Sequence, residues 1–290
     1  MINLLRRSRP LFLLIAALTY GLGASVANYL GEPLRVDAFW LGFIGVSMAQ
    51  LSMNLLTDVF RPPNEPIIPG ETFVERRSLR NNALYVSIAA LAAVALAAFV
   101  LFQNGRLSSL SMLLFGLSIF VVLVHAIPPL RLLDRGFGEF LQAAHLAYVV
   151  PAIAFLLQVQ QYHRLLALVT IPLTAIAFAY FIVLDFPAFA ADQKYERRTL
   201  LTLLGWQKAI PFHHALLITA YFLFAAAPFL GFSLQILWPV FITLPFAIFQ
   251  ILTLNNIASG GPANWTLLTV NALAVFGLTA YLLAMIFWLR

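Results

Sequence analysis

The chain has 290 residues, of which 62% are hydrophobic and only 10% charged, and its formal net charge is +6. A composition this apolar excludes a soluble globular protein and is typical of one embedded in a membrane. The sequence contains no cysteine, which excludes disulfides, iron–sulfur clusters and thiol catalysis.

Apolar runs of about 20 residues, the length that crosses the hydrocarbon core of a bilayer, recur along nearly the whole chain. They predict nine transmembrane helices, at roughly 11–30, 38–60, 83–103, 108–126, 138–158, 165–186, 209–229, 233–253 and 266–289. No segment between them is long enough to form a second domain. We therefore predict an all-α integral membrane protein whose residues 1–290 form a single polytopic domain.

Basic residues are divided unevenly between the two ends of these helices. If the N-terminus is inside, 13 of the 17 Lys and Arg residues fall in inner segments, at positions 6, 7, 9, 61, 76, 77, 80, 131, 135, 194, 197, 198 and 208. Inner loops of membrane proteins carry such an excess of positive charge, so we predict a cytoplasmic N-terminus. Because topology explains these residues, nucleic acid is not expected as a partner. The absence of a transit peptide favours a bacterial plasma membrane.

Two acidic clusters lie at the inner ends of apolar runs, where the expected helices leave the membrane. Asn54 and Asp58 share one helix face and precede Arg61, and Asp185 and Asp192 share another. A carboxylate at membrane depth costs roughly 2.5–3.5 kcal/mol, so paired ones indicate a functional site. Because each cluster leads into an arginine-rich loop, the simplest ligand is a diphosphate bound with Mg²⁺.

Basic side chains beside these acids are the candidates for direct contact with phosphate. Arg61, Lys194 and Arg198 are expected either to bind phosphate oxygens or to extend to the lipid headgroups. Arg197 is interpreted as a solvated neighbour and Glu65 as an exposed loop residue.

A third inner loop, 128–139, follows the fourth predicted helix and is rich in proline and glycine. Its Arg131 is expected either to reach the site or to cap the preceding helix. His125, at the inner end of that helix, is a candidate to orient an acceptor hydroxyl or to take its proton. The alternative for His125 is a hydrogen bond between helices.

Taken together, these three segments resemble the UbiA superfamily of intramembrane aromatic prenyltransferases. The resemblance covers almost the whole chain. The residues that carry it are Asn54, Asp58, Pro128, Pro129, Arg131, Gly136, Gly138, Glu139, Asp185, Asp192, Lys194, Arg198, Thr199, Leu200 and Gly205.

The resemblance implies a nine-helix bundle around a central cavity that opens laterally to lipid. It also implies an isoprenyl diphosphate held through Mg²⁺, whose isoprenyl chain is transferred to a small acceptor with loss of diphosphate. An aromatic quinone precursor is our leading expectation for that acceptor. The expected metal ligands are Asn54, Asp58, Asp185 and Asp192, of which the three aspartates are catalytic. The expected diphosphate contacts are Asn54, Arg61, Arg131, Lys194 and Arg198, and the expected acceptor contact is His125.

The chain departs from the family pattern at three acidic positions. Leu55, Pro62 and Ala188 stand where the resemblance implies aspartates. The alternative is therefore a degenerate relative that binds prenyl diphosphate without turnover. A membrane transporter on a similar scaffold is a second alternative, because transporters also use intramembrane acids. The position of the acids at helix ends weighs against it.

Overall fold

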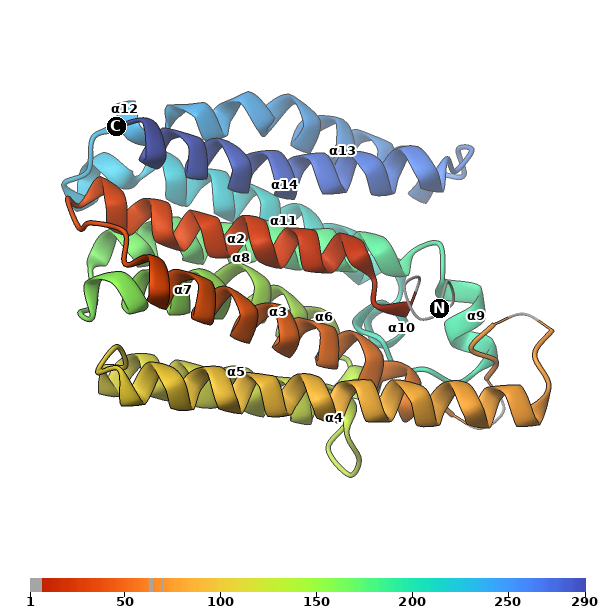
Figure 1. The fold of residues 1–290 in the computed structure, drawn as a ribbon. Helices are drawn as coiled ribbons and strands as arrows, with labels where there is room; N and C mark the ends of the chain where they lie inside the picture. The colour runs from red at the N-terminus through yellow and green to blue at the C-terminus, as the bar shows by residue number, and fades with distance from the viewer. Residues whose placement is uncertain (1–6, 63–64, 69) are drawn as a thin grey trace.

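The computed structural model describes residues 7–62, 65–68 and 70–290, and all regular secondary structure within them is helical (Figure 1). This part of the chain contains nine segments long and apolar enough to cross a membrane, as predicted. They are α2 (Pro10–Tyr29), α3 (Val36–Val59), α4 (Phe73–Gln103), α5 (Ser109–Ala126), α6 to α7 (Gly138–Val159), α8 (Arg164–Asp185), α11 (Trp206–Ala225), α12 to α13 (Leu234–Ala258) and α14 (Trp265–Leu289).

Two of these segments are interrupted, and short helices connect several others. In the fifth span, the π-helical turn η2 (His145–Val149) separates α6 (Gly138–Ala144) from α7 (Val150–Val159). In the eighth, η4 (Trp238–Thr243) separates α12 (Leu234–Leu237) from α13 (Leu244–Ala258). The connecting helices are η1 (Leu132–Arg135), α9 (Phe189–Lys194), α10 (Leu200–Leu204) and η3 (Ala227–Leu230).

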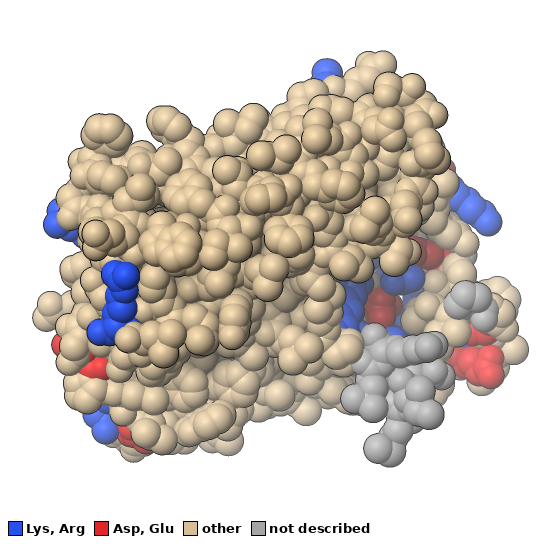
Figure 2. All heavy atoms as spheres, turned by 90° about the horizontal axis from the view of Figure 1, so that it is seen from above, with Lys and Arg blue, Asp and Glu red and all other residues tan. Residues whose placement is uncertain are grey.

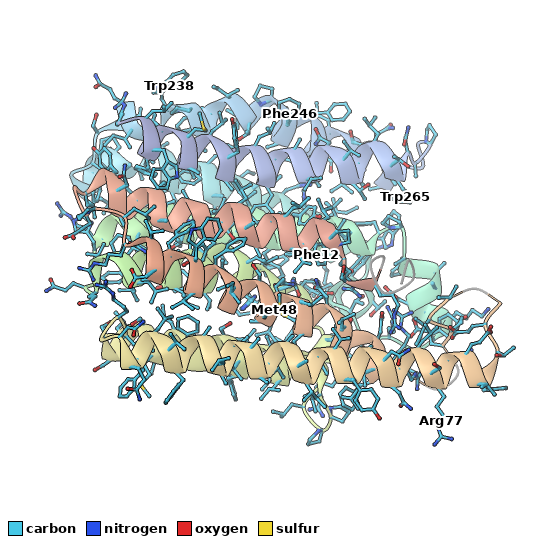
Figure 3. All side chains as sticks on the ribbon, viewed as in Figure 1. Phe12, Met48, Arg77, Trp238, Phe246 and Trp265 are labelled. Carbon is cyan, nitrogen blue, oxygen red and sulfur yellow. The ribbon has the colours of Figure 1, made fainter. Side chains whose placement is uncertain are left out.

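The largest difference from the predicted boundaries is in α4, which begins at Phe73 rather than near residue 83. A capping box starts the helix early: Thr72 Oγ1 accepts the Glu75 N–H at 3.2 Å, and the Glu75 carboxylate accepts the Thr72 N–H at 2.8 Å. The connection after α3 is therefore shorter than expected. The first turns of α4 carry Arg77 away from the bundle (Figures 1 and 3).

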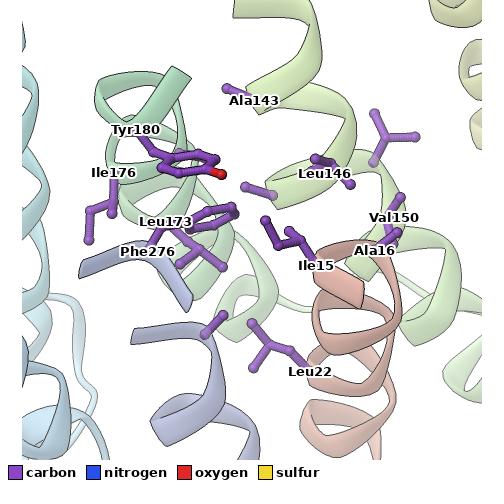
Figure 4. Close-up of a cluster of buried hydrophobic side chains, with 14 of the residues drawn as sticks. Ile15, Ala16, Leu22, Ala143, Leu146, Val150, Leu173, Ile176, Tyr180 and Phe276 are labelled. Atoms are coloured by element: carbon purple, nitrogen blue, oxygen red, sulfur yellow. The ribbon is translucent and has the colours of Figure 1, made fainter. Parts of the chain in front are cut away.

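The middle of the bundle is filled by packed apolar side chains from α2, α6, α7, α8 and α14 (Figure 4). At Gly23 in α2, a Cβ atom would lie 2.0 Å from the carbonyl oxygen of Pro151 in α7. The missing side chain lets the two backbones touch, as small residues do between membrane helices. The side chains in this core include Ile15, Ala16, Leu22, Ala143, Leu146, Val150, Leu173, Ile176, Tyr180 and Phe276.

Connections α9, α10 and the segment between α3 and α4 gather at one end of the bundle, here called the loop end (Figure 1). The face drawn in Figure 2 is almost entirely uncharged between its two ends, as expected for a surface in contact with lipid. Arg6, one of the basic residues used to predict the orientation, lies outside the described residues. The cytoplasmic position of the N-terminus stays a prediction.

Candidate active site

A cavity of about 190 Å³ lies at the loop end of the bundle. Its wall combines three cationic side chains with three acidic ones, and Figure 2 shows basic and acidic atoms together in a recess at this end. The cations are Arg9, Arg61 and Arg197, and the acids are Glu139, Asp185 and Asp192. Five separate parts of the chain thus meet around one polar space.

Asp58 is buried behind this wall, with only 5% of its surface exposed, and both of its oxygens contact arginines. Arg7 Nε lies 3.1 Å from Oδ2, and Arg61 Nη2 lies 2.9 Å from Oδ1. The carboxylate therefore holds two guanidinium groups, one of which lines the cavity. Its predicted role as a metal ligand stays a prediction.

Asn54 forms hydrogen bonds within the bundle. Its amide donates to the Ser8 carbonyl at 2.7 Å, and its Oδ1 accepts from Gln50 Nε2 at 2.8 Å. The contact with Ser8 joins α3 to the segment before α2, and the contact with Gln50 lies within α3. Asn54 is not among the residues that line the cavity, so the structure does not bring it to the acids of the second cluster.

Two of the sequence interpretations were wrong about exposure at the loop end. Glu65, expected to be exposed, is 5% exposed and lies 3.0 Å from Arg61 Nη1. Its carboxylate also accepts Arg197 Nε at 2.9 Å, so Arg197 is a partly buried, ion-paired residue rather than a solvated neighbour. Arg197 Nη1 reaches Asp192 Oδ1 at 3.5 Å. A continuous chain of charges therefore runs from Asp58 to Asp192.

The basic residues expected to bind phosphate are divided by the fold. Arg61 lines the cavity, whereas Lys194 and Arg198 are exposed and are not in its wall. The Lys194 Nζ lies 5.4 Å from the centre of the Tyr195 ring. Arg131 is 9% exposed, forms an ion pair with Asp134 and is not in the cavity wall, so its contact with diphosphate stays a prediction.

Arg9 is a cavity residue that the sequence analysis counted only toward topology. Its Nη2 donates to Thr57 Oγ1 at 3.2 Å, and burial lowers the pKa of its guanidinium, while Asp58 acts in the opposite direction. A partly buried cation in a cavity wall indicates a preference for an anionic ligand. The only sequence signal was the position of Arg9 next to the first apolar run.

Asp185 and Asp192, expected to act together, both line the cavity. The Oδ2 atom of Asp185 is buried and has no hydrogen-bond partner within the described structure. Asp192 is 3% exposed, and burial raises the pKa of its carboxyl to about 6, with Arg197 opposing the rise. A cation bound beside these two acids would therefore stabilise their charged carboxylate forms.

His125 lines the same cavity from the end of α5 and is 3% exposed. Its Nδ1 is buried without a hydrogen-bond partner within the described structure. The other buried histidine nearby differs, because the ring nitrogens of His145 contact Ser118 Oγ at 2.9 Å and Gln50 Oε1 at 3.0 Å. His125 therefore has the free polar atom that an acceptor contact requires.

Among the described residues, no three Asp, Glu or His side chains already converge on a metal position. Mg²⁺ does not need such a cage, because it commonly binds one or two carboxylates together with water and substrate phosphates. The unpartnered oxygen of Asp185 beside a cluster of arginines matches that donor set.

The fold is similar over nearly its full length to solved structures of UbiA homologues. A UbiA homolog from Archaeoglobus fulgidus bound to GPP and Mg²⁺ has a TM-score of 0.70 at 15% identity, covering 99% of this chain and 98% of that one. A structure described as a UbiA homolog from the same organism bound to DMAPP and Mg²⁺ has a TM-score of 0.66 at 14% identity, covering 97% and 99%.

An apo structure of a UbiA homolog from Aeropyrum pernix K1 has a TM-score of 0.54 at 14% identity, covering 91% of this chain and 96% of that one. No family model matches the sequence, and no curated protein sequence matches it. At these identities the likeness establishes the fold. It confirms the UbiA-like fold that the sequence motifs implied.

Proposed function

We propose that this protein is a membrane prenyltransferase that moves an isoprenyl chain from a prenyl diphosphate to a small aromatic acceptor, with a quinone precursor as the expected class. One observation supports this most directly: partly buried arginines and an unpartnered carboxylate oxygen share one cavity. Similar folds have been solved with GPP, DMAPP and Mg²⁺ bound. The distribution of Lys and Arg supports a cytoplasmic position for this end of the bundle.

The arginines of the cavity are placed to hold the diphosphate. Guanidinium groups match phosphate oxygens in geometry and charge, so Arg9, Arg61 and Arg197 are the proposed contacts. Asp58 and Glu65 hold Arg61 and Arg197 in position through ion pairs. Groups oriented in advance stabilise developing charge without a reorganisation cost, which is the main electrostatic contribution that a protein makes.

The acids Asp185 and Asp192 are the proposed ligands of Mg²⁺. When bound, Mg²⁺ would offset the negative charge of the diphosphate and make it a better leaving group. The unpartnered Oδ2 of Asp185 is available for such a bond without breaking a hydrogen bond inside the protein.

The remaining wall of the cavity suits the transferred chain and the acceptor. Phe12, Phe181 and Leu184 form an apolar side that excludes water from an allylic cation, and aromatic faces stabilise positive charge. His125 is placed to orient an acceptor hydroxyl or to take its proton.

The test is turnover of radiolabelled GPP and DMAPP by the full chain reconstituted in liposomes, with and without Mg²⁺, against a panel of aromatic acceptors. We expect a Mg²⁺-dependent product that Asp185→Ala and Arg197→Ala abolish. Glu32→Gln, at the opposite end of the bundle, is the control for the negative charge that Asp185→Ala removes.

Two outcomes would contradict the proposal in different ways. Diphosphate binding without product across the panel would favour a degenerate relative that binds and does not transfer. Absence of any diphosphate binding would exclude a prenyl diphosphate as the ligand and favour the transporter alternative.

A further inference from the structure

Glu139 lines the cavity but has no role in the reaction proposed above. It begins the fifth span, next to Gly138, and is 7% exposed. One carboxylate oxygen, Oε1, accepts the Leu200 N–H at 2.8 Å. The other, Oε2, is buried and has no hydrogen-bond partner within the described structure. Half of this carboxylate is therefore fixed by the protein, and the other half is available.

The local backbone explains how Glu139 reaches the cavity. Gly136 has φ +79°, a conformation that glycine adopts without strain, and it turns the chain between η1 and α6. At Gly138, a Cβ atom would lie 2.8 Å from Leu133 Cδ1 and 3.0 Å from Leu133 Cα. The missing side chain lets η1 pack against the start of α6, which positions Glu139 in the cavity wall.

The cavity wall holds a second acid with a free oxygen. Asp185 lines the same cavity, interacts electrostatically with Glu139, and has an Oδ2 that is likewise buried and unpartnered in the described structure. Two buried carboxylates in contact repel each other unless a cation or a proton lies between them. Two of the cavity arginines, Arg61 and Arg197, contact other acids, namely Asp58, Glu65 and Asp192. The third, Arg9, donates to Thr57.

Glu139 also adds a carboxylate to the cavity wall, in which the position of Ala188 provides none. Ala188, which stands where the family resemblance implies an aspartate, lines the cavity with only a methyl group. The segment from α8 to α9 therefore contributes two carboxylates to the cavity, Asp185 and Asp192, and α6 contributes the third.

We propose that Glu139 is a ligand of the divalent cation, bound through Oε2 opposite Asp185. This inference rests on the proposed function, because the remaining coordination positions are taken by water and diphosphate oxygens. The site is then complete only when the diphosphate is bound.

The first experiment uses the wild-type chain, with Mn²⁺ as a paramagnetic substitute for Mg²⁺ and pyrophosphate as the anion. Glutamate is labelled with ¹³C at its side-chain carboxyl, and electron–nuclear double resonance measures the ¹³C coupling to the bound Mn²⁺. We expect a strong coupling, because Glu139 is the glutamate in the cavity wall. Absence of the coupling while Mn²⁺ and pyrophosphate bind would overturn the assignment, whatever the behaviour of variants.

The second experiment compares variants in the same binding measurement. Glu139→Gln should weaken Mn²⁺ binding at least about tenfold, since groups merely behind metal ligands already contribute roughly 10- to 100-fold. It should also abolish the ¹³C coupling and increase the number of water molecules on Mn²⁺. Glu32→Gln should change none of these. A Glu139→Gln protein that binds Mn²⁺ like the wild type would overturn the assignment.

If the proposed function is wrong, the result differs from the one expected when only the Glu139 assignment is wrong. In that case the wild-type chain would bind neither pyrophosphate nor Mn²⁺ with pyrophosphate. A proton shared by Glu139 and Asp185, the other way to relieve their repulsion, would appear as bound Mn²⁺ without a glutamate coupling.

Discussion

Arg7 Nε lies 3.1 Å from Asp58 Oδ2, and this contact joins the segment before α2 to the end of α3. The second oxygen of Asp58 lies 2.9 Å from Arg61 Nη2. Asp58 therefore has both oxygens engaged, unlike Asp185 in the second cluster. The two acidic clusters look alike in sequence but differ in the structure: the first positions arginines, and the second offers carboxylate oxygens.

Asp58→Asn should destabilise the protein and weaken diphosphate binding together. Removing one partner from a buried ion pair costs about 3–5 kcal/mol, because the remaining charge stays buried and unpaired. Arg61 also loses the contact that holds it in the cavity wall. We expect a lower unfolding temperature in detergent and weaker pyrophosphate binding even in EDTA.

The matched control is Asp37→Asn, which breaks the ion pair between Asp37 and Arg106. That pair is 3.0 Å long but largely exposed, so its loss should have little effect on the unfolding temperature. If Asp58→Asn left metal-free pyrophosphate binding intact and abolished only the metal-dependent part, Asp58 would be a metal ligand rather than a holder of arginines.

The spans could be predicted from sequence because crossing a bilayer imposes length and apolarity directly on the chain. The early start of α4 was missed because residues 75–82, in its first turns, are mostly polar. Arg76 and Arg77 were assigned to a loop by composition, whereas the local capping box of Thr72 and Glu75 determines the helix start.

The site was predicted less completely, because local sequence patterns do not predict which residues pair across long distances in the chain. Glu65 and Arg197 are 132 positions apart, and each looks like a solvated loop residue on its own. Their burial follows from how the connections pack at the loop end. Lys194 was expected in the site because it matches the position of a lysine in the family pattern, but at the end of α9 its side chain is exposed.

Acidification should release the connection that precedes α4, through Glu71. Burial acts to raise the pKa of Glu71, but hydrogen bonds from the Ile67 and Ile68 amides and from Arg76 outweigh it, so this pKa lies below its ordinary value of 4.5. A carboxyl with a lowered folded-state pKa stabilises the fold above the unfolded value, and this stabilisation is lost as the pH falls through the folded value.

Hydrogen exchange of the Ile67 and Ile68 amides checks this expectation, since the Glu71 carboxylate accepts them at 2.7 and 3.0 Å. Protection should fall below pH 4.5 beyond the intrinsic change in exchange rate. Glu71→Gln should show the reduced protection already at neutral pH and no further pH dependence. Equal protection in the variant and the wild type at neutral pH would show that other contacts hold this segment.

His125→Gln should impair use of the acceptor while leaving the diphosphate site intact. The unpartnered Nδ1 of His125 lies in the cavity wall, where loss of a proton acceptor would lower kcat/KM for the aromatic acceptor by about 100-fold or more. Pyrophosphate affinity should not change. His145→Gln is the comparison, because His145 is bonded on both ring nitrogens within the bundle. It should lower stability rather than acceptor use, and a similar kinetic loss in both variants would remove His125 from its proposed role.

Phe181 should limit the length of the prenyl chain that the cavity accepts. Its ring packs edge-on against Phe12, with centroids 5.4 Å apart, and both line a cavity of only about 190 Å³. Phe181→Ala should favour farnesyl diphosphate over GPP by about tenfold, since farnesyl carries one more five-carbon isoprene unit and burying the equivalent of two methylene groups of it contributes roughly 1.6 kcal/mol. Competition binding of the two diphosphates measures this ratio. Phe140→Ala, which truncates a 46% exposed ring outside the cavity, should leave it unchanged. An unchanged ratio in Phe181→Ala would place the prenyl chain along another wall.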